Sequence, residues 1–132
     1  MSKCIVVVDQ DLPVGLKANI SAVLCMSLGK GVPDLVGPPV RTGDDVEFPG
    51  ITTVPVPILQ APGGDLKTLY EKTAGEAFVV AFTDAAMETK DYDSYTRRMS
   101  EKTVGDLVVY GLLIHGAKKM VNKLSGSLAL LK

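Results

Sequence analysis

Three uninterrupted apolar runs constrain the fold of this 132-residue chain more than any other feature. Residues 4–8, 77–82 and 107–114 are apolar at nearly every position and rich in β-branched side chains. Runs of this length without polar alternation are typical of strands that are covered on both faces. The rest of the chain must therefore supply a layer on each side of a sheet.

Helical patterns lie between these runs. Apolar residues recur at three- and four-residue spacing, with charged residues on the opposite side. The positions are Leu66, Leu69, Tyr70 and Thr73 behind Asp65; Tyr92, Tyr95 and Met99 behind Asp91; and Ala117, Met120, Val121 and Leu124. Strands that alternate with helices in this way predict an α/β fold. We expect a three-layer α/β/α sandwich with a mixed, mostly parallel sheet of four to five strands.

The segment from Val14 to Leu28 predicts a helix that is apolar around most of its circumference. Lys17 is its only charged residue. Such a helix needs cover on every side, and one sheet buries only one of them. The other side is covered either by another part of the chain or by a second subunit. We therefore predict a homodimer or a small symmetric homo-oligomer in which this helix, or the insertion beside it, forms the contact.

A segment rich in proline and glycine, residues 31–53, interrupts the alternation of strands and helices. Long structureless loops are uncommon in compact domains. Val40-Arg41-Thr42 and Val46-Glu47-Phe48 alternate around a glycine-containing turn, which predicts a small hairpin laid over the first helix or the site. Because 132 residues is the usual size of one domain, we expect a single α/β domain spanning residues 1–132 with this insertion.

Composition and charge exclude several classes of function. The formal net charge is -1, so no overall field attracts the chain to nucleic acid or to an anionic membrane, and neither is an expected partner. The N-terminal apolar stretch is too short for a signal peptide or a membrane span, which predicts a cytoplasmic location. Cys4 and Cys25 lack the spacing of a metal or redox site, so we expect no metal and no cofactor.

Polar side chains follow the predicted strands, where open α/β sheets bind their ligands. The first strand leads to Asp11, the second to Thr83 and Asp84, and the third to His115. If these strands are parallel neighbours, the polar groups converge at one end of the sheet, as in general acid/base sites. Structural alternatives stay open: Asp11 and Asp84 are also placed to cap helices, and His115 to be a hydrogen-bonded rim residue.

Lys17 is the single charge on an otherwise apolar helix, and Ser21 shares its face at the i+4 position. The lysine either reaches solvent along the helix surface or faces Asp84 in a site. We predict that Lys17 and Asp84 lie within salt-bridge or one-water reach and are the candidate catalytic residues. The candidate ligand-binding residues are Asp11, Ser21, Thr83 and His115.

Several motifs of well-known enzymes are absent. The chain has no G-x-x-x-x-G-K-[ST], no G-x-G-x-x-G, no G-x-S-x-G and no H-E-x-x-H. Lys118, Lys119 and Lys123 lie near one another on the last predicted helix, but no aromatic residues lie between them. This pattern indicates a solvated face rather than a nucleic-acid interface.

Three segments resemble one known family. They are the first strand with its Asp11-Leu12-x-x-Gly15 turn, the Thr83-Asp84-Ala85 step, and the C-terminal Asn122-Lys123-Leu124-Ser125-Gly126-x-Leu128-x-Leu130 segment. Together they resemble type II peptidyl-tRNA hydrolases, and within that fold an uncharacterised family of unknown function with a Pro/Gly-rich insertion. The resemblance covers most of the chain and implies that Asp84 matches the catalytic aspartate of the hydrolases and Lys17 one of their lysines.

The chain departs from the hydrolases around the first helix. Leu16 and Ala18 flank Lys17 where the family has further basic or glycine residues, and the family's glutamine and histidine are missing. Three hypotheses follow. The first is binding of a small molecule in a cleft at the strand ends. The second is residual hydrolysis of peptidyl-tRNA or an aminoacyl ester, with Asp84 orienting water and Lys17 holding an anion. The third is a non-enzymatic oligomeric interaction module.

Overall fold

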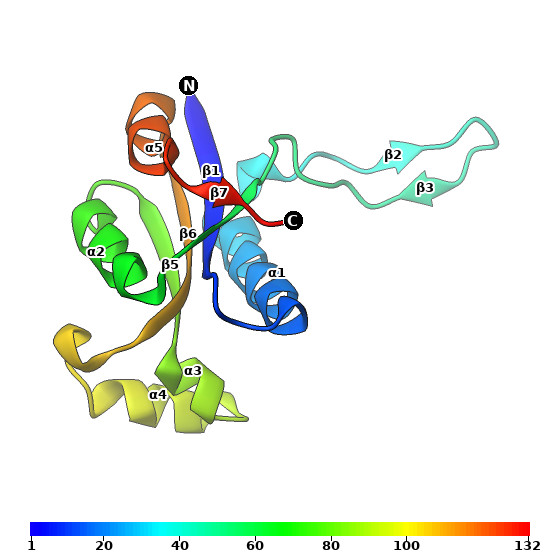
Figure 1. Cartoon of the computed structure of the whole chain (residues 1–132). Helices are drawn as coiled ribbons and strands as arrows, with labels where there is room; N and C mark the ends of the chain where they lie inside the picture. Colours follow the sequence, from blue (N-terminus) through cyan, green and yellow to red (C-terminus); the bar gives the residue numbers. More distant parts are fainter.

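The computed structural model describes residues 1–132 (Figure 1). In chain order the elements are β1 (Ser2–Asp9), α1 (Val14–Gly31), the 3-10 turn η1 (Pro33–Leu35), β2 (Val40–Arg41), β3 (Glu47–Phe48), β4 (Ile58–Ala61), α2 (Gly63–Thr73), β5 (Phe78–Thr83), α3 (Asp84–Glu88), α4 (Tyr92–Ser100), the 3-10 turn η2 (Val104–Asp106), β6 (Val109–Ala117), α5 (Lys118–Ser125) and β7 (Ala129–Leu130). The fold is α/β, and the helices predicted from sequence periodicity are all present. None of them is long and apolar enough to span a membrane.

The main sheet has five strands in the order β5-β6-β1-β4-β7, and it is mostly antiparallel. Only β1 and β4 pair in parallel; β6 is antiparallel to both β1 and β5, and β7 to β4. The predicted mostly parallel sheet is therefore wrong. Parallel neighbours need a crossover that returns the chain across a sheet face. Between β5 and β6 the helices α3 and α4 lie beyond the end of the sheet instead, so β6 runs back beside β5 (Figure 1).

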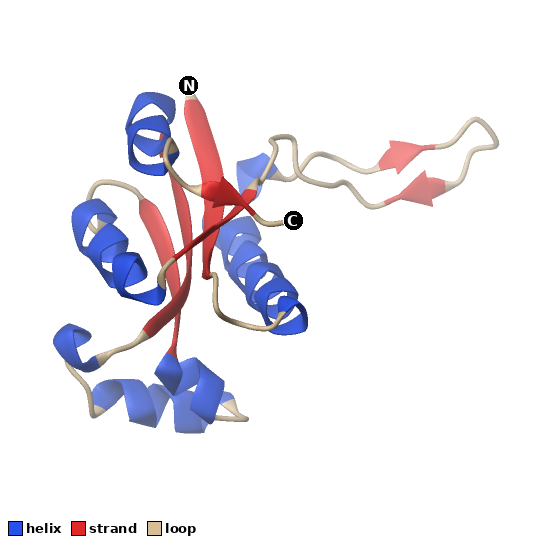
Figure 2. Cartoon of the chain, in the orientation of Figure 1, coloured by secondary structure: helices blue, strands red, loops and turns tan.

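Helices cover both faces of this sheet, which gives three layers (Figure 2). Alternate residues of β1 point to opposite faces. Cys4, Val6 and Val8 pack in the cluster that includes α1, whereas Ile5 and Val7 pack in the cluster that includes α2 and α5. The uninterrupted apolar run of β1 thus reflects two covered faces, and this pattern does not depend on whether the neighbouring strands are parallel.

The helix α1 lies close against the sheet because β6 carries a glycine beneath it. A Cβ atom at Gly111 would be 2.5 Å from Cγ2 of Ile20, so any side chain at this position would push the helix away. Ile20, Leu24 and Leu28 are buried in this contact, whereas Ala18, Ala22 and Met26 on the other side of α1 are exposed. No segment of the same chain covers that other side.

The insertion forms the predicted hairpin, in which Val40 pairs with Phe48 and Arg41 with Glu47. Its predicted position over α1 or the site is wrong, because the hairpin projects away from the body of the molecule (Figure 1). Backbone bonds at its base, from Gly37 N–H to the Ile51 carbonyl and from Thr53 N–H to the Leu35 carbonyl, set this outward direction. Every residue from 38 to 49 is exposed.

Candidate functional site

The strands β1, β4 and β5 run in the same direction, so their carboxyl ends meet at one end of the sheet. We call the residues at this end, 9–15, 60–64 and 83–84, the strand-end rim. The strand β6 runs the opposite way, and its His115 pairs with Cys4 near the start of β1. There Nε2 of His115 lies 3.1 Å from Oγ of Ser2. The predicted convergence of His115 with the other site residues is therefore wrong.

Lys17 is buried at the strand-end rim, with only 8% of the residue exposed. Its Nζ donates a hydrogen bond of 3.0 Å to Oε1 of Gln60 on β4. That amide is neutral, and the ion pairs of the structure are made by Arg41, Arg98 and Lys102 instead. A buried charge without a counter-ion is unfavourable. The ammonium group of Lys17 thus lacks the anionic partner that would balance its burial.

The amino end of α1 adds to this positive charge. Lys17 lies in the first turns of the helix, which has no acidic residue in its first turn and no side-chain cap. Unpaired N–H groups give the end of a helix partial positive charge. A Cβ atom at Gly15 would meet nothing within 4 Å, so the backbone here faces open space. The helix amino end and the ammonium group of Lys17 together are suited to a small anion.

The helix α2 begins at the same rim, but acidic side chains balance the partial positive charge at its amino end. Asp65 lies in its first turn. The carboxylate of Asp9 lies against Gly63, where a Cβ atom would be only 2.6 Å from Oδ2 of Asp9. The uncompensated positive charge is consequently at the α1 side of the rim, next to Lys17.

Asp84 has a different environment from Lys17. It is 7% exposed. Its Oδ2 accepts from Nζ of Lys102 at 2.5 Å, and its Oδ1 accepts from the Val108 N–H at 3.1 Å. Burial raises the pKa of Asp84, but the hydrogen bond from Lys102 and that from the Val108 amide outweigh it, so the net pKa is lowered. Both oxygens of this carboxylate are thus engaged within the protein.

Lys17 and Asp84 do not form the predicted pair, because each has another partner. Lys17 contacts β4 and Asp84 follows β5, and in the sheet these strands are separated by β6 and β1. Three strand spacings amount to about 14 Å. The predicted two-residue catalytic centre is therefore divided into two separate places on the rim.

Two of the other predicted site residues, Ser21 and Thr83, use their hydroxyl groups internally. The hydroxyl of Ser21 donates to the Lys17 carbonyl at 2.8 Å, and that of Thr83 lies 3.6 Å from Sδ of Met99. Asp11 is exposed, and only its backbone N–H is engaged, with Oδ1 of Asp9. Neither Asp11 nor Asp84 caps a helix by its side chain: Pro13 holds the cap position of α1, and Thr83 that of α3.

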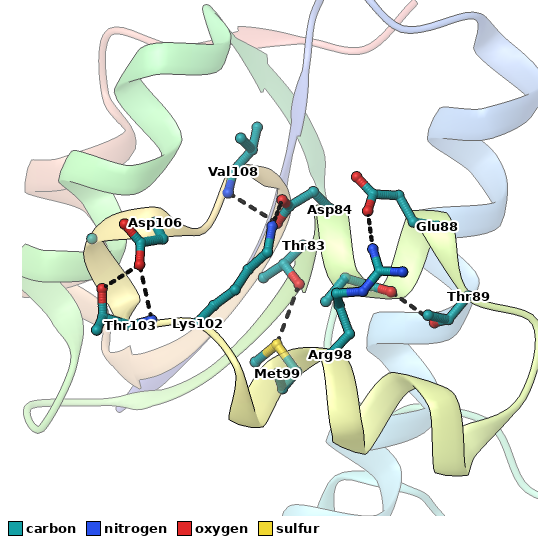
Figure 3. Close-up of polar contacts among 12 residues, drawn as sticks. Thr83, Asp84, Glu88, Thr89, Arg98, Met99, Lys102, Thr103, Asp106 and Val108 are labelled. Atoms are coloured by element: carbon teal, nitrogen blue, oxygen red, sulfur yellow. Dashed lines mark hydrogen bonds and ion pairs between the residues drawn. The ribbon is translucent and has the colours of Figure 1, made fainter.

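Contacts around Asp84 connect the elements that lie beyond the sheet (Figure 3). An ion pair between Glu88 and Arg98 joins α3 to α4. Asp91 caps α4 by accepting from the Ser94 N–H at 2.8 Å. Thr103 and Asp106 form a reciprocal capping box around η2. These bonds hold the long β5–β6 connection in place, so we assign Asp84 a structural role.

Two hollows open on either side of β5, which is an edge strand of the sheet. One, of about 460 Å³, lies between α1, β5 and α4 and is lined mainly by apolar side chains. The other, of about 310 Å³, lies toward α2 and η2, and Thr83 lines it. Tyr95 lines both, and burial, followed by the neighbouring Tyr92, raises its pKa. Lys17 lines neither hollow. No group of three His, Cys, Asp or Glu side chains is arranged to hold a metal ion.

The sequence reasoning missed two partner residues. Gln60 was overlooked because the four-residue strand β4 is too short to give a clear apolar run. Its signal was a polar residue two positions before the Pro62-Gly63-Gly64 helix start. Lys102 gave no signal, because it is one of 14 basic residues and meets Asp84 only through the tertiary fold.

A family model described as a protein of unknown function, DUF2000, matches residues 2–132. No curated protein sequence matches the chain. Among solved structures, a protein of unknown function from Agrobacterium tumefaciens is similar with a TM-score of 0.90. The two chains are 17% identical, and the alignment covers 99% of this chain and 98% of that chain. At this identity the similarity extends to the fold alone.

Proposed function

The chain belongs to DUF2000, a family of proteins of unknown function, and we propose from its own site that it binds a small anionic molecule at the strand-end rim, with Lys17 as the charged anchor. The observation that carries this proposal is the buried ammonium of Lys17, whose hydrogen-bond partner is the neutral amide of Gln60. An anion beside it would supply the missing counter-charge.

A purely structural role explains Lys17 less well. The neighbouring buried positions of α1 are held by Ile20 and Leu24, and an aliphatic side chain at position 17 would avoid the cost of burying a charge. A cation near the amino end of a helix is also opposed by the helix dipole. Both costs are reduced when an anion lies between the helix end and the ammonium group.

The arrangement indicates the chemical class of the ligand. A single lysine offers a compact point charge rather than the two parallel donors of an arginine, and it suits either a phosphate or a carboxylate group. The N–H groups at the start of α1, which no side chain caps, can bind such a group as well. The proposed ligand therefore carries a phosphate or a carboxylate group. Titration with compounds of each class distinguishes the two.

The test is calorimetric titration with inorganic phosphate, a phosphomonoester and a short aliphatic carboxylate. We expect at least one of these classes to bind, and Lys17→Met to weaken that binding on the order of tenfold or more. Lys30→Met, which removes an exposed lysine at the other end of α1, is the matched control and should bind as the wild type does. Equal binding by wild type and Lys17→Met would contradict the proposal.

The second candidate function is hydrolysis of peptidyl-tRNA or an aminoacyl ester. A type II peptidyl-tRNA hydrolase-like fold is proposed with it. The position of Lys17 at the strand ends supports it. The engagement of both Asp84 oxygens by Lys102 and Val108 weakens it, because a water-orienting carboxylate needs a free lone pair. Salt-sensitive affinity for tRNA and release of an N-blocked amino acid from its tRNA would favour this candidate over simple anion binding.

Self-association is the third class of function predicted from sequence, and it stays a proposal. The exposed side chains of Val23 and Met26 on α1 support it. A cytoplasmic location also stays a proposal, supported by the free thiols of Cys4 and Cys25, which are typical of a reducing compartment.

A further inference from the structure

The strand β5 forms an open edge of the main sheet. It pairs with β6 on one side, and no strand pairs with it on the other. Its sequence, Phe78-Val79-Val80-Ala81-Phe82-Thr83, contains no charged residue and no proline. Edge strands usually carry such residues or are covered, because an open edge can pair with another chain. The edge of β5 thus lacks the usual protection against pairing.

The register of the sheet shows which backbone groups of β5 point outward. Antiparallel partners alternate between pairs that exchange hydrogen bonds and pairs that do not. The N–H of Val6 donates to the segment that leads into β4, so its partner on β6, Leu113, directs its backbone groups toward β5. Leu113 pairs there with Val80. The N–H and C=O groups of the neighbouring Val79 and Ala81 therefore point to the open edge.

Two hollows flank this edge, one on each face of the sheet. We call the hollow of about 460 Å³ the α1-side hollow and that of about 310 Å³ the α2-side hollow. Val80, Ala81 and Tyr95 line both, so the hollows adjoin along β5. Successive side chains of a strand point to opposite faces of its sheet. The side chains of a strand added beside β5 would consequently enter the two hollows in turn.

The linings of the hollows hold two lysines and one carboxylate. Lys90 lines the α1-side hollow and Lys67 the α2-side hollow, and neither forms an ion pair. Lys67 donates a hydrogen bond to the neutral Gly105 carbonyl. The carboxylate is that of Asp91, and both of its oxygens accept from Ser94. An added strand with acidic side chains at its ends would complement the two lysines.

We propose that β5 binds an extended peptide segment of another protein, which adds a strand to the sheet at this edge. Main-chain hydrogen bonds to Val79 and Ala81 supply affinity, and the two hollows select apolar side chains at successive positions. A second copy of this chain fits the edge less well, because Phe78 and Val80 of its own β5 already pack in the cluster that includes its own α1. This inference does not depend on the proposed anion site.

The test is titration of the protein with fluorescently labelled synthetic peptides, followed by anisotropy. The peptides have about seven residues, because the regular edge from Phe78 to Phe82 is roughly 17 Å long. Each has Asp at both ends and Val, Leu, Phe or Ser between. We expect peptides with consecutive apolar residues to bind in the micromolar range, and serine-rich peptides to bind on the order of tenfold more weakly. Replacing the terminal Asp residues by Lys should weaken binding about two- to fivefold.

Backbone substitution separates strand addition from the filling of a hollow by side chains alone. In an added strand only alternate amides face β5. N-methylation of one alternate set of peptide amides should therefore weaken binding on the order of tenfold or more, and N-methylation of the other set should have little effect. Bound peptide should also slow hydrogen exchange at the amides of Val79 and Ala81.

A variant of the protein tests the same edge. Ala81→Pro removes an outward N–H and should weaken binding on the order of tenfold, and proline is tolerated where the N–H of an edge strand faces solvent. Circular dichroism checks that the variant folds. The matched control is Phe48→Ala, which removes an exposed apolar side chain from the distant β2–β3 hairpin and should bind peptide as the wild type does (Figure 1).

Three results would overturn this inference. The first is the absence of binding by every peptide at high micromolar concentration. The second is an equal effect of the two methylated sets, which would assign binding to the hollows without strand addition. The third is a wild-type dimer that Ala81→Pro dissociates, which would assign the edge to a second copy of this chain. If Ala81→Pro does not fold, the methylated peptides and the exchange of the Val79 and Ala81 amides decide.

Discussion

The carboxylate of Asp84 lies 2.5 Å from the ammonium group of Lys102, and this ion pair joins the end of β5 to the segment that follows α4. The same aspartate exchanges two hydrogen bonds with Val108, since its N–H donates to the Val108 carbonyl and its Oδ1 accepts from the Val108 N–H. Asp84 thereby holds both ends of the long β5–β6 connection together.

Asp84→Asn should destabilise the protein. The substitution keeps an oxygen for the Val108 N–H but removes the charge that Lys102 contacts, and hydrogen bonds to charged groups contribute about 1.5–3 kcal/mol. We expect the free energy of unfolding, measured with urea, to fall by about that amount. Glu88→Gln, which removes the more exposed ion pair with Arg98, is the control and should cost less. Unchanged stability in Asp84→Asn, together with lost ligand binding, would return Asp84 to the functional site.

The stabilisation by Asp84 should also depend on pH. Its pKa in the folded protein lies below the ordinary value of 3.8, so the folded state binds the proton less readily than the unfolded state. The contribution is therefore fully present above the unfolded pKa and is lost as the pH falls below 3.8 toward the folded value. The difference in unfolding free energy between wild type and Asp84→Asn should be constant near neutral pH and shrink in acid. A difference that grows in acid would show the opposite sign.

Gly111→Ala should disturb the packing of α1 on β6. The added methyl group would lie 2.5 Å from Cγ2 of Ile20, which is fully buried and cannot move aside freely. Overpacked core positions typically cost about 1–3 kcal/mol. Thermal and urea unfolding measure the loss. Gly43→Ala at the tip of the β2–β3 hairpin, where a Cβ atom meets nothing within 4 Å, is the control and should have little effect. Equal effects of the two substitutions would argue against the close helix–sheet contact.

Cys4 should be inert in the folded protein. Burial, and then the neighbouring Cys25, raise the pKa of its thiol to about 12, and the side chain is inaccessible. Burial also raises the pKa of Cys25, but this residue is partly exposed. Because the thiolate is the reactive form, iodoacetamide near pH 8 should label Cys25 slowly and Cys4 only after unfolding. Mass spectrometry of the labelled peptides distinguishes the two, and rapid native labelling of Cys4 would contradict its burial.

The sequence predicted the layers of this fold better than its strand directions. Continuous apolar runs reported correctly that both faces of β1 and β6 are covered, and helical periodicity located α1, α2, α4 and α5. Strand direction depends on where the connecting helices pack, and nothing in the sequence shows that α3 and α4 lie beyond the end of the sheet. The wrong direction predicted for β6 also placed His115 at the wrong end of the sheet.

The position of Lys17 was predicted, and its role in a site stays a proposal. Lys17 stood out as the single charge on an apolar helix, and it is indeed buried at the strand ends. The partners of Lys17 and Asp84 were not predicted. Gln60 and Lys102 are polar residues without a distinguishing sequence pattern, and only the tertiary fold brings them to Lys17 and Asp84. The sequence also predicted the β2–β3 hairpin, but it could not show that this hairpin points away from α1.

The most direct measurement of the proposed function is the crystal structure of the protein soaked in selenate, with the selenium located by anomalous scattering. Selenate has the shape and charge of a phosphate-like anion. We expect a peak within hydrogen-bond distance of Nζ of Lys17 and beside the free N–H groups at the start of α1, and no such peak in Lys17→Met. Selenate bound only elsewhere, or bound equally in Lys17→Met, would contradict the assignment of Lys17 as the anchor of an anion site.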